Sequence, residues 1–331
     1  MSKPKVFVAR LIPDAGLDKV RAACAADIWS EPLPPPAEVL RERIAQCDGL
    51  LALLTDRIDG AVMDAAPRLK VISNYAVGFN NIDIPAATER GILVGNTPGV
   101  LTDSTADMAF ALLIVAARRI VESVRYATDG HWKTWEPLGH IGQDLTGRTI
   151  GIVGMGRIGL AMARRCYGGW GMKVIYHSPR NNAEADRDLN AERVELPRLL
   201  AESDFISVHT NLNDTTRGMF NAQAFRQMKP TCVFVNTSRG PLVVEADLER
   251  ALREGWIFSA GLDVTDPEPP PMDSPLFSVP NCVVAPHIAS ATVTSRNAMA
   301  DIAADNLIAG VTGNPLRHCV NPEAAQNAGK R

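Results

Sequence analysis

Residues 149–159 read TIGIVGMGRIG, an apolar run of strand-forming residues that leads into Gly-x-Gly-x-x-Gly at Gly154, Gly156 and Gly159. Good helix formers follow, and a second apolar run, KVIY at 173–176, stands at the distance of a β-α-β unit. The first glycine permits a sharp turn, the second leaves room for a pyrophosphate, and the third lets the helix pack close to the strand. The helix N-terminus then offers N–H groups to phosphate. The stretch predicts a dinucleotide site; the alternative is a glycine-rich turn without a ligand.

Strand-like and helix-like segments alternate on both sides of this stretch. Apolar runs precede it at 6–8, 49–54, 71–73 and 93–94, and from the glycine stretch onward they recur at 150–153, 173–176, 205–209, 232–236, 259–262 and 283–285. This rhythm predicts an α/β protein with two doubly wound parallel-sheet domains in tandem. The length of 331 residues suits two domains of ordinary size.

Composition narrows the classes of function. The net charge is −3 and no long basic run occurs, which argues against a nucleic-acid partner. The longest apolar stretch, 109–117, is too short to span a bilayer, and the start lacks a signal-peptide pattern, so we expect a cytoplasmic protein without a membrane partner. The six cysteines are scattered without Cys-x-x-Cys, which favours inert thiols. The six histidines show no metal-ligand spacing, and we predict no metal site.

Two segments lie between the predicted domains. Residues 103–118 read as a helix whose middle, 108–115, is apolar on all sides, as in helices buried between domains or subunits. Residues 126–144 carry few strand signals but hold Trp132 and Trp135. We expect either a subunit-swapped arm or an ordinary surface loop.

Four further blocks stand in the sequence: NYAVGFNNID at 74–83, NTPGVLT at 96–102, VNTSRG at 235–240 and APHIASAT at 285–292. Together with the glycine stretch, they resemble the NAD(P)-dependent D-2-hydroxyacid dehydrogenases, and within that family the glyoxylate/hydroxypyruvate reductase branch. The resemblance covers almost the whole chain, with the blocks in the family's order.

The resemblance implies a discontinuous layout. A flavodoxin-like substrate domain would comprise residues 1–99 and 289–331, and a Rossmann NAD(P)-binding domain residues 100–288, with the active site between them and homodimers as the usual assembly. The implied activity is NAD(P)H-dependent reduction of small 2-keto acids, glyoxylate to glycolate and hydroxypyruvate to D-glycerate.

Three residues carry the expected chemistry. His287 follows a strand-like run, at the edge where open α/β sheets place their sites, and a histidine suits proton donation to the forming alkoxide. Glu268 matches the family's acidic partner of the histidine, although Asp266 competes with it from two residues earlier. Arg239 can hold a substrate carboxylate through two hydrogen bonds. We predict that Arg239, Glu268 and His287 form the catalytic triad.

The resemblance also implies binding residues. Val77 and Gly78 would offer backbone N–H groups to the substrate carboxylate, Leu53 would line the pocket, and Trp135 would reach a neighbouring subunit's site. The implied cofactor contacts are Gly154, Gly156, Arg157, Ile158, Gly159, Thr102, Thr210, Thr237, Ser238, Asp263 and Ala289.

The type of cofactor depends on the end of the second strand. Dinucleotide sites selective for NAD place an acidic residue there, about twenty residues past the glycines. This sequence instead reads YHSPRN at 176–181, with no acid. Ser178 and Arg180 can bind a 2′-phosphate, so we predict NADP as the preferred cofactor, with NAD as a possible second.

Other functions stay open from the sequence alone. The chain also fits a D-lactate, phosphoglycerate or 2-ketogluconate type of D-2-hydroxyacid dehydrogenase. A cofactor-bound, corepressor-like binding protein of the same fold can retain the triad.

Overall fold

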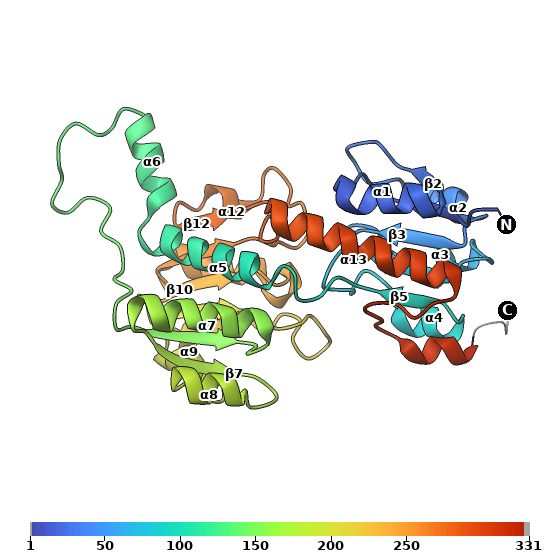
Figure 1. The fold of residues 1–331 in the computed structure, drawn as a ribbon. Helices are drawn as coiled ribbons and strands as arrows, with labels where there is room; N and C mark the ends of the chain where they lie inside the picture. Colours follow the sequence, from blue (N-terminus) through green and yellow to red (C-terminus); the bar gives the residue numbers. More distant parts are fainter. Residues whose placement is uncertain (1, 328–331) are drawn as a thin grey trace. The chain divides into compact units, whose positions relative to one another are not determined.

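A computed structural model describes residues 2–327 and divides the chain into two units. Unit 1 comprises Met1–Leu101 and Ala291–Arg331, and unit 2 comprises Thr102–Ser290. Each unit is a parallel sheet with helices on both faces (Figure 1). The predicted domain boundaries, 99/100 and 288/289, lie two residues before the observed ones at 101/102 and 290/291.

The sheet of unit 1 has five parallel strands in the order β2-β1-β3-β4-β5, the flavodoxin-like order. Each strand is three or four residues long, and the central ones are buried on both faces, as expected for a parallel sheet. The strands are β1 Lys5–Val8, β2 Ala25–Ile28, β3 Gly49–Ala52, β4 Val71–Asn74 and β5 Leu93–Gly95.

Helices cover both faces of this sheet. α1 (Asp14–Ala23) and α13 (Val293–Thr312) pack together on one face. The other face is covered by α2 (Ala37–Ile44), α3 (Gly60–Asp64) and α4 (Ile84–Glu89), and a short 3₁₀ turn, η2 (Pro322–Asn327), packs against α4 and β5. Asp59 and Asp83 start α3 and α4, because their side chains accept hydrogen bonds from free N–H groups of the first turn.

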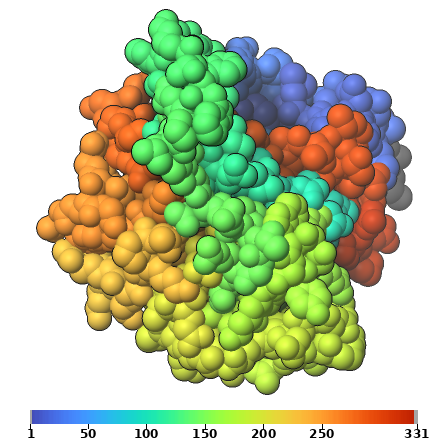
Figure 2. Space-filling model, turned by 90° about the vertical axis from the view of Figure 1, so that its left-hand side faces the viewer, coloured from blue at the N-terminus to red at the C-terminus, as the bar shows by residue number. Residues whose placement is uncertain are grey.

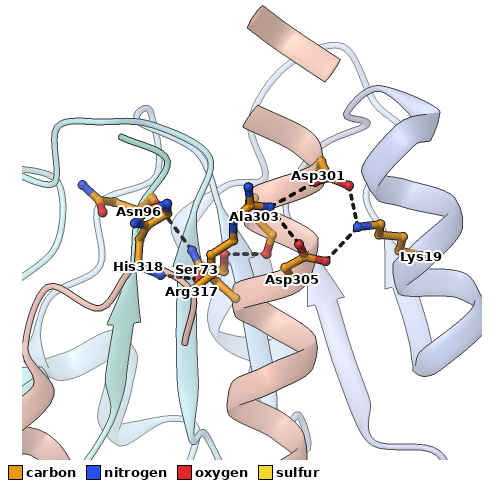
Figure 3. A network of polar contacts seen from close by, with 9 residues as sticks. Lys19, Ser73, Asn96, Asp301, Ala303, Asp305, Arg317 and His318 are labelled. Carbon is orange, nitrogen blue, oxygen red and sulfur yellow. Dashed lines mark hydrogen bonds and ion pairs between the residues drawn. The ribbon is translucent and has the colours of Figure 1, made fainter. Parts of the chain in front are cut away.

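A polar network holds the C-terminal part of the chain in unit 1 (Figure 3). Lys19 of α1 lies 2.5 Å from Asp301 and 2.8 Å from Asp305, both on α13. Arg317 contacts the same two carboxylates at 3.2 and 3.1 Å. Deeper in the unit, Ser73 Oγ of β4 donates to the Ala303 carbonyl of α13 at 2.7 Å. A segment near the end of the chain is thereby tied to the first helix and to a central strand.

The sheet of unit 2 has seven parallel strands in the order β12-β11-β10-β9-β6-β7-β8. Read from the other edge, the order β8-β7-β6-β9-β10-β11-β12 is that of a Rossmann fold with one additional strand. The strands are β6 Thr149–Val153, β7 Lys173–His177, β8 Glu192–Arg193, β9 Phe205–Val208, β10 Val233–Asn236, β11 Ser259–Leu262 and β12 Cys282–Val284.

Two apolar clusters sandwich this sheet. Along β10, Val233 and Val235 belong to one cluster and Phe234 to the other, because successive strand residues point to opposite faces. The first cluster includes helices α5 (Thr102–Ala117), α7 (Arg157–Trp170) and α8 (Ala183–Leu189). The second includes α9 (Leu196–Glu202), α10 (Ala222–Gln227), α11 (Glu245–Arg253) and α12 (Pro275–Ser278), and the 3₁₀ turn η1 (Gly240–Leu242) precedes α11.

The apolar helix expected over 103–118 is α5, which packs on β10 and β11 within unit 2. The next helix, α6 (Ile120–Thr128), was not among the predicted elements. Residues 129–144 follow it without a helix or strand, and this segment stands out from the surface of unit 2 in green (Figure 2). Among residues 2–327, no helix is long and apolar enough to cross a membrane.

Candidate active site

The predicted acid–base pair forms in unit 2. Nδ1 of His287 lies 2.5 Å from Oε1 of Glu268. His287 follows β12 at the carboxyl edge of the sheet, where Rossmann folds place their ligands. Because Nδ1 is engaged by the carboxylate, Nε2 is the ring atom that can exchange a proton with a substrate. Both side chains keep some solvent access, with 22% and 34% of their surface exposed.

His287 adopts an unusual backbone conformation. Its φ is +53°, in the left-handed region that few residues other than glycine occupy. Such a conformation persists only when its surroundings hold it, and such residues cluster at active sites. Asp263 supplies the support: its two carboxylate oxygens accept the N–H groups of Ile288 and Ala289, each at 2.8 Å.

Asp263 is 1% exposed, and burial raises the pKa of its carboxyl group while the two N–H groups oppose that rise. The sequence assigned Asp263 and Ala289 to the cofactor. The structure joins these two residues by a hydrogen bond two residues after His287, and their contact with a cofactor stays a prediction.

Arg239 follows β10, and the main chain holds it in place. The Asn236 side chain donates to the Arg239 carbonyl at 2.9 Å, and Nη1 of Arg239 donates to the Ser238 carbonyl at 2.6 Å. Burial lowers the pKa of the guanidinium, and the negative charge of Glu268 partly offsets that effect. A partly desolvated cation attracts an anion more strongly than one in water, which suits Arg239 to a carboxylate ligand.

The glycine loop has the geometry that a pyrophosphate needs. Gly154 has φ +98°, and a Cβ there would lie 2.6 Å from the main chain of His209. A Cβ on Gly159 would lie 2.1 Å from the Gly154 carbonyl. Beside Gly156, by contrast, no described heavy atom lies within 4 Å of the Cβ position, and no side chain caps the N-terminus of α7. The open space and the free N–H groups of Arg157 and Ile158 therefore fit a dinucleotide phosphate.

A second observation agrees with a ligand at this edge. Thr237 Oγ1, directly after β10, is buried and meets no hydrogen-bond partner among the described residues. Buried hydroxyls normally have a partner, so this one has room for a contact from outside the chain. The neighbouring Ser238 Oγ donates to the Val208 carbonyl at 3.1 Å. The other two predicted contacts lie at the start of α5 (Thr102) and after β9 (Thr210).

The loop after β7 carries Ser178 and Arg180, both at least partly exposed. The structure adds Arg193, a cation that the sequence analysis missed. Arg193 Nε donates to the Ser178 carbonyl at 2.8 Å and Nη2 to the Pro179 carbonyl at 3.3 Å. Arg193 lies on β8, which pairs with β7, but β8 is only two residues long and gave no strand signal.

A histidine just after β9 also escaped the sequence analysis. His209 Nε2 lies 2.8 Å from Ser207 Oγ, and burial lowers the pKa of His209 to about 3. The ring of His209, whose main chain lies beside Gly154, therefore stays neutral.

The residues predicted to bind substrate carboxylate lie in unit 1. Val77 and Gly78 follow β4 and are partly exposed, and their N–H groups meet no acceptor within residues 2–327. Leu53 follows β3, and its N–H donates to Asp56 Oδ2 at 2.8 Å. Trp135, predicted to serve a neighbouring subunit, lies in the 129–144 segment of unit 2 with 80% of its surface exposed.

Cysteines and metal-binding groups add nothing to this site. All six cysteines are free thiols, and burial raises the pKa of Cys47 to about 11 and that of Cys166 to about 12, so both stay protonated. Within residues 2–327, no cluster of three or more His, Cys, Asp or Glu side chains could hold a metal ion.

The chain is similar in sequence to known proteins. The sequence model of the D-isomer specific 2-hydroxyacid dehydrogenase NAD-binding domain matches residues 110–289. A glyoxylate reductase of Korarchaeum cryptofilum is 49% identical over 325 residues, 98% of each chain. A glyoxylate reductase of Thermococcus litoralis is 47% identical over 325 residues, 97% of this chain and 98% of its own.

Solved structures show the same fold. A protein of Thermus thermophilus superimposes with a TM-score of 0.89 at 44% identity, over 96% of this chain and 99% of its own. An NADPH-dependent glyoxylate/hydroxypyruvate reductase of Sinorhizobium meliloti, in complex with NADP and malonate, gives a TM-score of 0.86 at 31% identity over 98% of each chain. The chain therefore belongs to the D-isomer specific 2-hydroxyacid dehydrogenases, as an NAD(P)-dependent oxidoreductase.

Proposed function

We propose that this enzyme reduces glyoxylate to glycolate and hydroxypyruvate to D-glycerate, with Arg239, Glu268 and His287 as its catalytic residues. The observation that carries the proposal is the 2.5 Å contact between His287 Nδ1 and Glu268 Oε1, at the carboxyl edge of a sheet whose glycine loop is open to a dinucleotide. The two relatives described above, matched over 98% of their own length, carry the name glyoxylate reductase, which supports this substrate class.

Each residue has a separate task in the reduction. Arg239 holds the 2-keto acid through its carboxylate, and its positive charge also favours the negative charge that develops on the keto oxygen. His287 gives the proton on Nε2 to that oxygen, so that the new hydroxyl group of the 2-hydroxy acid is neutral. Glu268 orients the ring through Nδ1 and stabilises the imidazolium before the proton leaves. When bound, the reduced nicotinamide cofactor supplies the hydride that the keto carbon receives.

A panel of 2-keto acids tests the substrate assignment. Oxidation of NADPH is followed at 340 nm with glyoxylate, hydroxypyruvate, pyruvate, phosphohydroxypyruvate and 2-ketogluconate. We expect the highest kcat/KM with glyoxylate or hydroxypyruvate. A higher value with one of the other three would replace the proposal with a D-lactate, phosphoglycerate or sugar-acid activity in the same family.

We propose that NADP is the preferred cofactor. In place of the acid that would repel a 2′-phosphate, the loop after β7 offers the Ser178 hydroxyl and the Arg180 guanidinium. Arg193 adds positive charge at the same loop and fixes its carbonyls. An NADP-bound structure among the similar proteins supports this preference.

Substitution of Arg180 separates the two cofactors. Arg180→Asp should raise KM for NADPH at least tenfold and change KM for NADH much less, because only NADPH carries the phosphate. The matched control is Arg187→Asp, an exposed arginine of α8 that pairs with Asp188. Equal effects of Arg180→Asp on both cofactors would refute the assignment.

We further propose that the enzyme is a homodimer in which residues 120–144 contact the second copy. Large apolar side chains are exposed along this segment, among them Trp132, Trp135, Leu138 and Ile141, with exposures of 58–83%. Exposed apolar surface of this extent is typical of protein interfaces. Light scattering should give a dimer for the native chain and a monomer for Trp135→Asp with Leu138→Asp. A native monomer would refute the proposal.

A further inference from the structure

Three successive peptide carbonyls after β4 are held by hydrogen bonds. The Ala76 carbonyl accepts the N–H of Thr97 at 2.9 Å. The Val77 carbonyl accepts Nδ2 of Asn96 at 2.8 Å. The Gly78 carbonyl accepts Nδ2 of Asn74 at 2.9 Å. Two of the three donors are therefore neutral side-chain amides.

These bonds set the direction of the N–H groups on the other side of each peptide. A trans peptide is planar, and its C=O and N–H point in opposite directions. Holding the Ala76 carbonyl therefore turns the Val77 N–H away from Thr97, and holding the Val77 carbonyl turns the Gly78 N–H away from Asn96. Within the described chain neither N–H meets an acceptor, so both are available to an anion.

Asn96 is itself held firmly. Its N–H donates to the His318 carbonyl at 3.3 Å, and its carbonyl accepts Nδ2 of Asn306 at 3.0 Å (Figure 3). Asn306 lies on α13 and is fully buried, and its Oδ1 accepts the N–H of His318 at 3.0 Å. With its main chain fixed on both sides by the C-terminal segment, the Asn96 side chain has a defined position from which to donate to Val77.

Asn74 is held from the other direction. Its Nδ2 also donates to Oδ1 of Asn81 at 3.2 Å. Nδ2 of Asn81 donates to the carbonyls of Leu53 at 3.0 Å and Asp56 at 3.1 Å. The loop after β3 and the loop after β4 are thus joined through two asparagines.

We propose that Asn96 and Asn74 are positioning residues for the substrate carboxylate. Asn96 holds the Val77 carbonyl and so directs the Gly78 N–H toward the anion, and Asn74 holds the Gly78 carbonyl and so fixes the peptide on the other side of Gly78. The proposal rests on the proposed function, in which Val77 and Gly78 bind that carboxylate. Preorganised N–H groups bind an anion without reorganisation at the moment of binding, and neutral amides achieve this without a competing charge.

The test separates binding from chemistry. Asn96→Ala removes the donor, and Asn96→Asp keeps the shape but presents an acceptor to the Val77 carbonyl. We expect KM for glyoxylate to rise about tenfold in Asn96→Ala and more in Asn96→Asp, with kcat within about twofold of the native value. The dissociation constant of oxalate from the NADPH-bound enzyme, measured by calorimetry, should rise by the same factors. The dissociation constant of NADPH should not change.

Asn321→Ala is the matched control. Asn321 is another fully buried asparagine of unit 1, and it binds the main chain of β5 by accepting the Val94 N–H at 2.7 Å. Its loss should lower Tm and leave KM and oxalate binding unchanged. If Asn96→Ala lowers Tm in the same way without weakening oxalate, Asn96 is merely structural and the proposal is wrong.

A second variant covers the case in which Asn96→Ala does not fold. Asn74→Ser keeps a short polar side chain, and its KM and oxalate affinity should change in the same direction. Unchanged values would overturn the proposal. Failure of the proposed function would appear in a different measurement: the native enzyme would reduce another 2-keto acid with a higher kcat/KM than glyoxylate or hydroxypyruvate. The KM and kcat of the asparagine variants would then be compared with that acid as substrate.

Discussion

The two sheets use different chemistry at their carboxyl edges. In unit 2 the edge carries charged side chains, with His287 bound to Glu268 and Arg239 subject to the charge of Glu268. In unit 1 the loop predicted to bind substrate is held by the neutral amides of Asn74 and Asn96. We expect the charged residues of unit 2 to hold the substrate and move the proton, and the neutral amides of unit 1 to orient main-chain N–H groups toward the substrate carboxylate.

This difference has an energetic reason. Buried charges are costly unless paired, and burial shifts the pKa values of Arg239 and Asp263 in unit 2. An amide donates a hydrogen bond at any pH and adds no charge. We therefore expect substitutions in unit 2 to change kcat and its pH dependence, and substitutions of the asparagines in unit 1 to change KM.

The largest effect should come from His287→Ala. Removal of the proton donor should lower kcat by roughly 10²–10⁴-fold, the usual contribution of a general acid, and leave NADPH binding intact. Steady-state kinetics and fluorescence titration with NADPH measure the two quantities. If His287→Ala kept the native kcat and had a raised KM, His287 would serve substrate binding and not proton transfer.

Glu268→Gln should have a smaller effect, about 10–100-fold on kcat near neutral pH. Glutamine keeps the size of the side chain but removes the negative charge that stabilises the imidazolium of His287. Glu245→Gln is the control. Glu245 lies on α11 and accepts the N–H of Asp266, two residues before Glu268, and among the described hydrogen bonds it makes none to His287. A native kcat in Glu268→Gln would show that the negative charge of Glu268 is not needed.

The smallest effect concerns Asp56, a buried carboxylate in the loop after β3 of unit 1. Asp56 accepts the Leu53 N–H, and burial raises the pKa of Asp56 to about 6, with this hydrogen bond and the positive charge of Arg10 opposing the rise. The folded protein thus holds this proton more tightly than the unfolded chain. The resulting stabilisation is largest at acid pH and is lost as the pH rises through 6.

Asp56→Asn should remove that pH dependence and keep an acceptor for Leu53. Between pH 5 and pH 8 the free energy of unfolding of the native protein should fall by roughly 1–1.5 kcal/mol more than that of the variant. Urea unfolding followed by circular dichroism measures both. Parallel pH curves for the two proteins would contradict the raised pKa, and unchanged KM would separate this stability effect from substrate binding.

Much of the fold was predictable because its signals are local. The apolar runs of β3, β4, β6 and β10 are buried on both faces and read directly as parallel strands. β8 and α6 were missed: β8 is two exposed residues long, and α6 has no fully buried residue, so neither shows a strong pattern. The assignment of a strand order needed the tertiary structure, because pairing depends on contacts between distant segments.

The candidate site divides in the same way. The glycine loop and the motif around His287 are continuous in sequence and were readable. Arg193, Asn74 and Asn96 escaped notice because each acts on the main chain of a neighbouring loop. A polar residue at the end of a buried strand, such as Asn74 on β4, was the signal that could have identified the amide pair.

The sequence by itself determined the α/β class, the dinucleotide loop and the residue types that the reaction needs, because turn geometry, helix starts and proton chemistry depend on near neighbours. The tertiary structure decided that α13 packs against α1, that Asp263 holds the segment after His287, and that three carbonyls beyond β4 are anchored. Those contacts join residues far apart in the chain, and only packing of the completed sheets brings their atoms within hydrogen-bond distance.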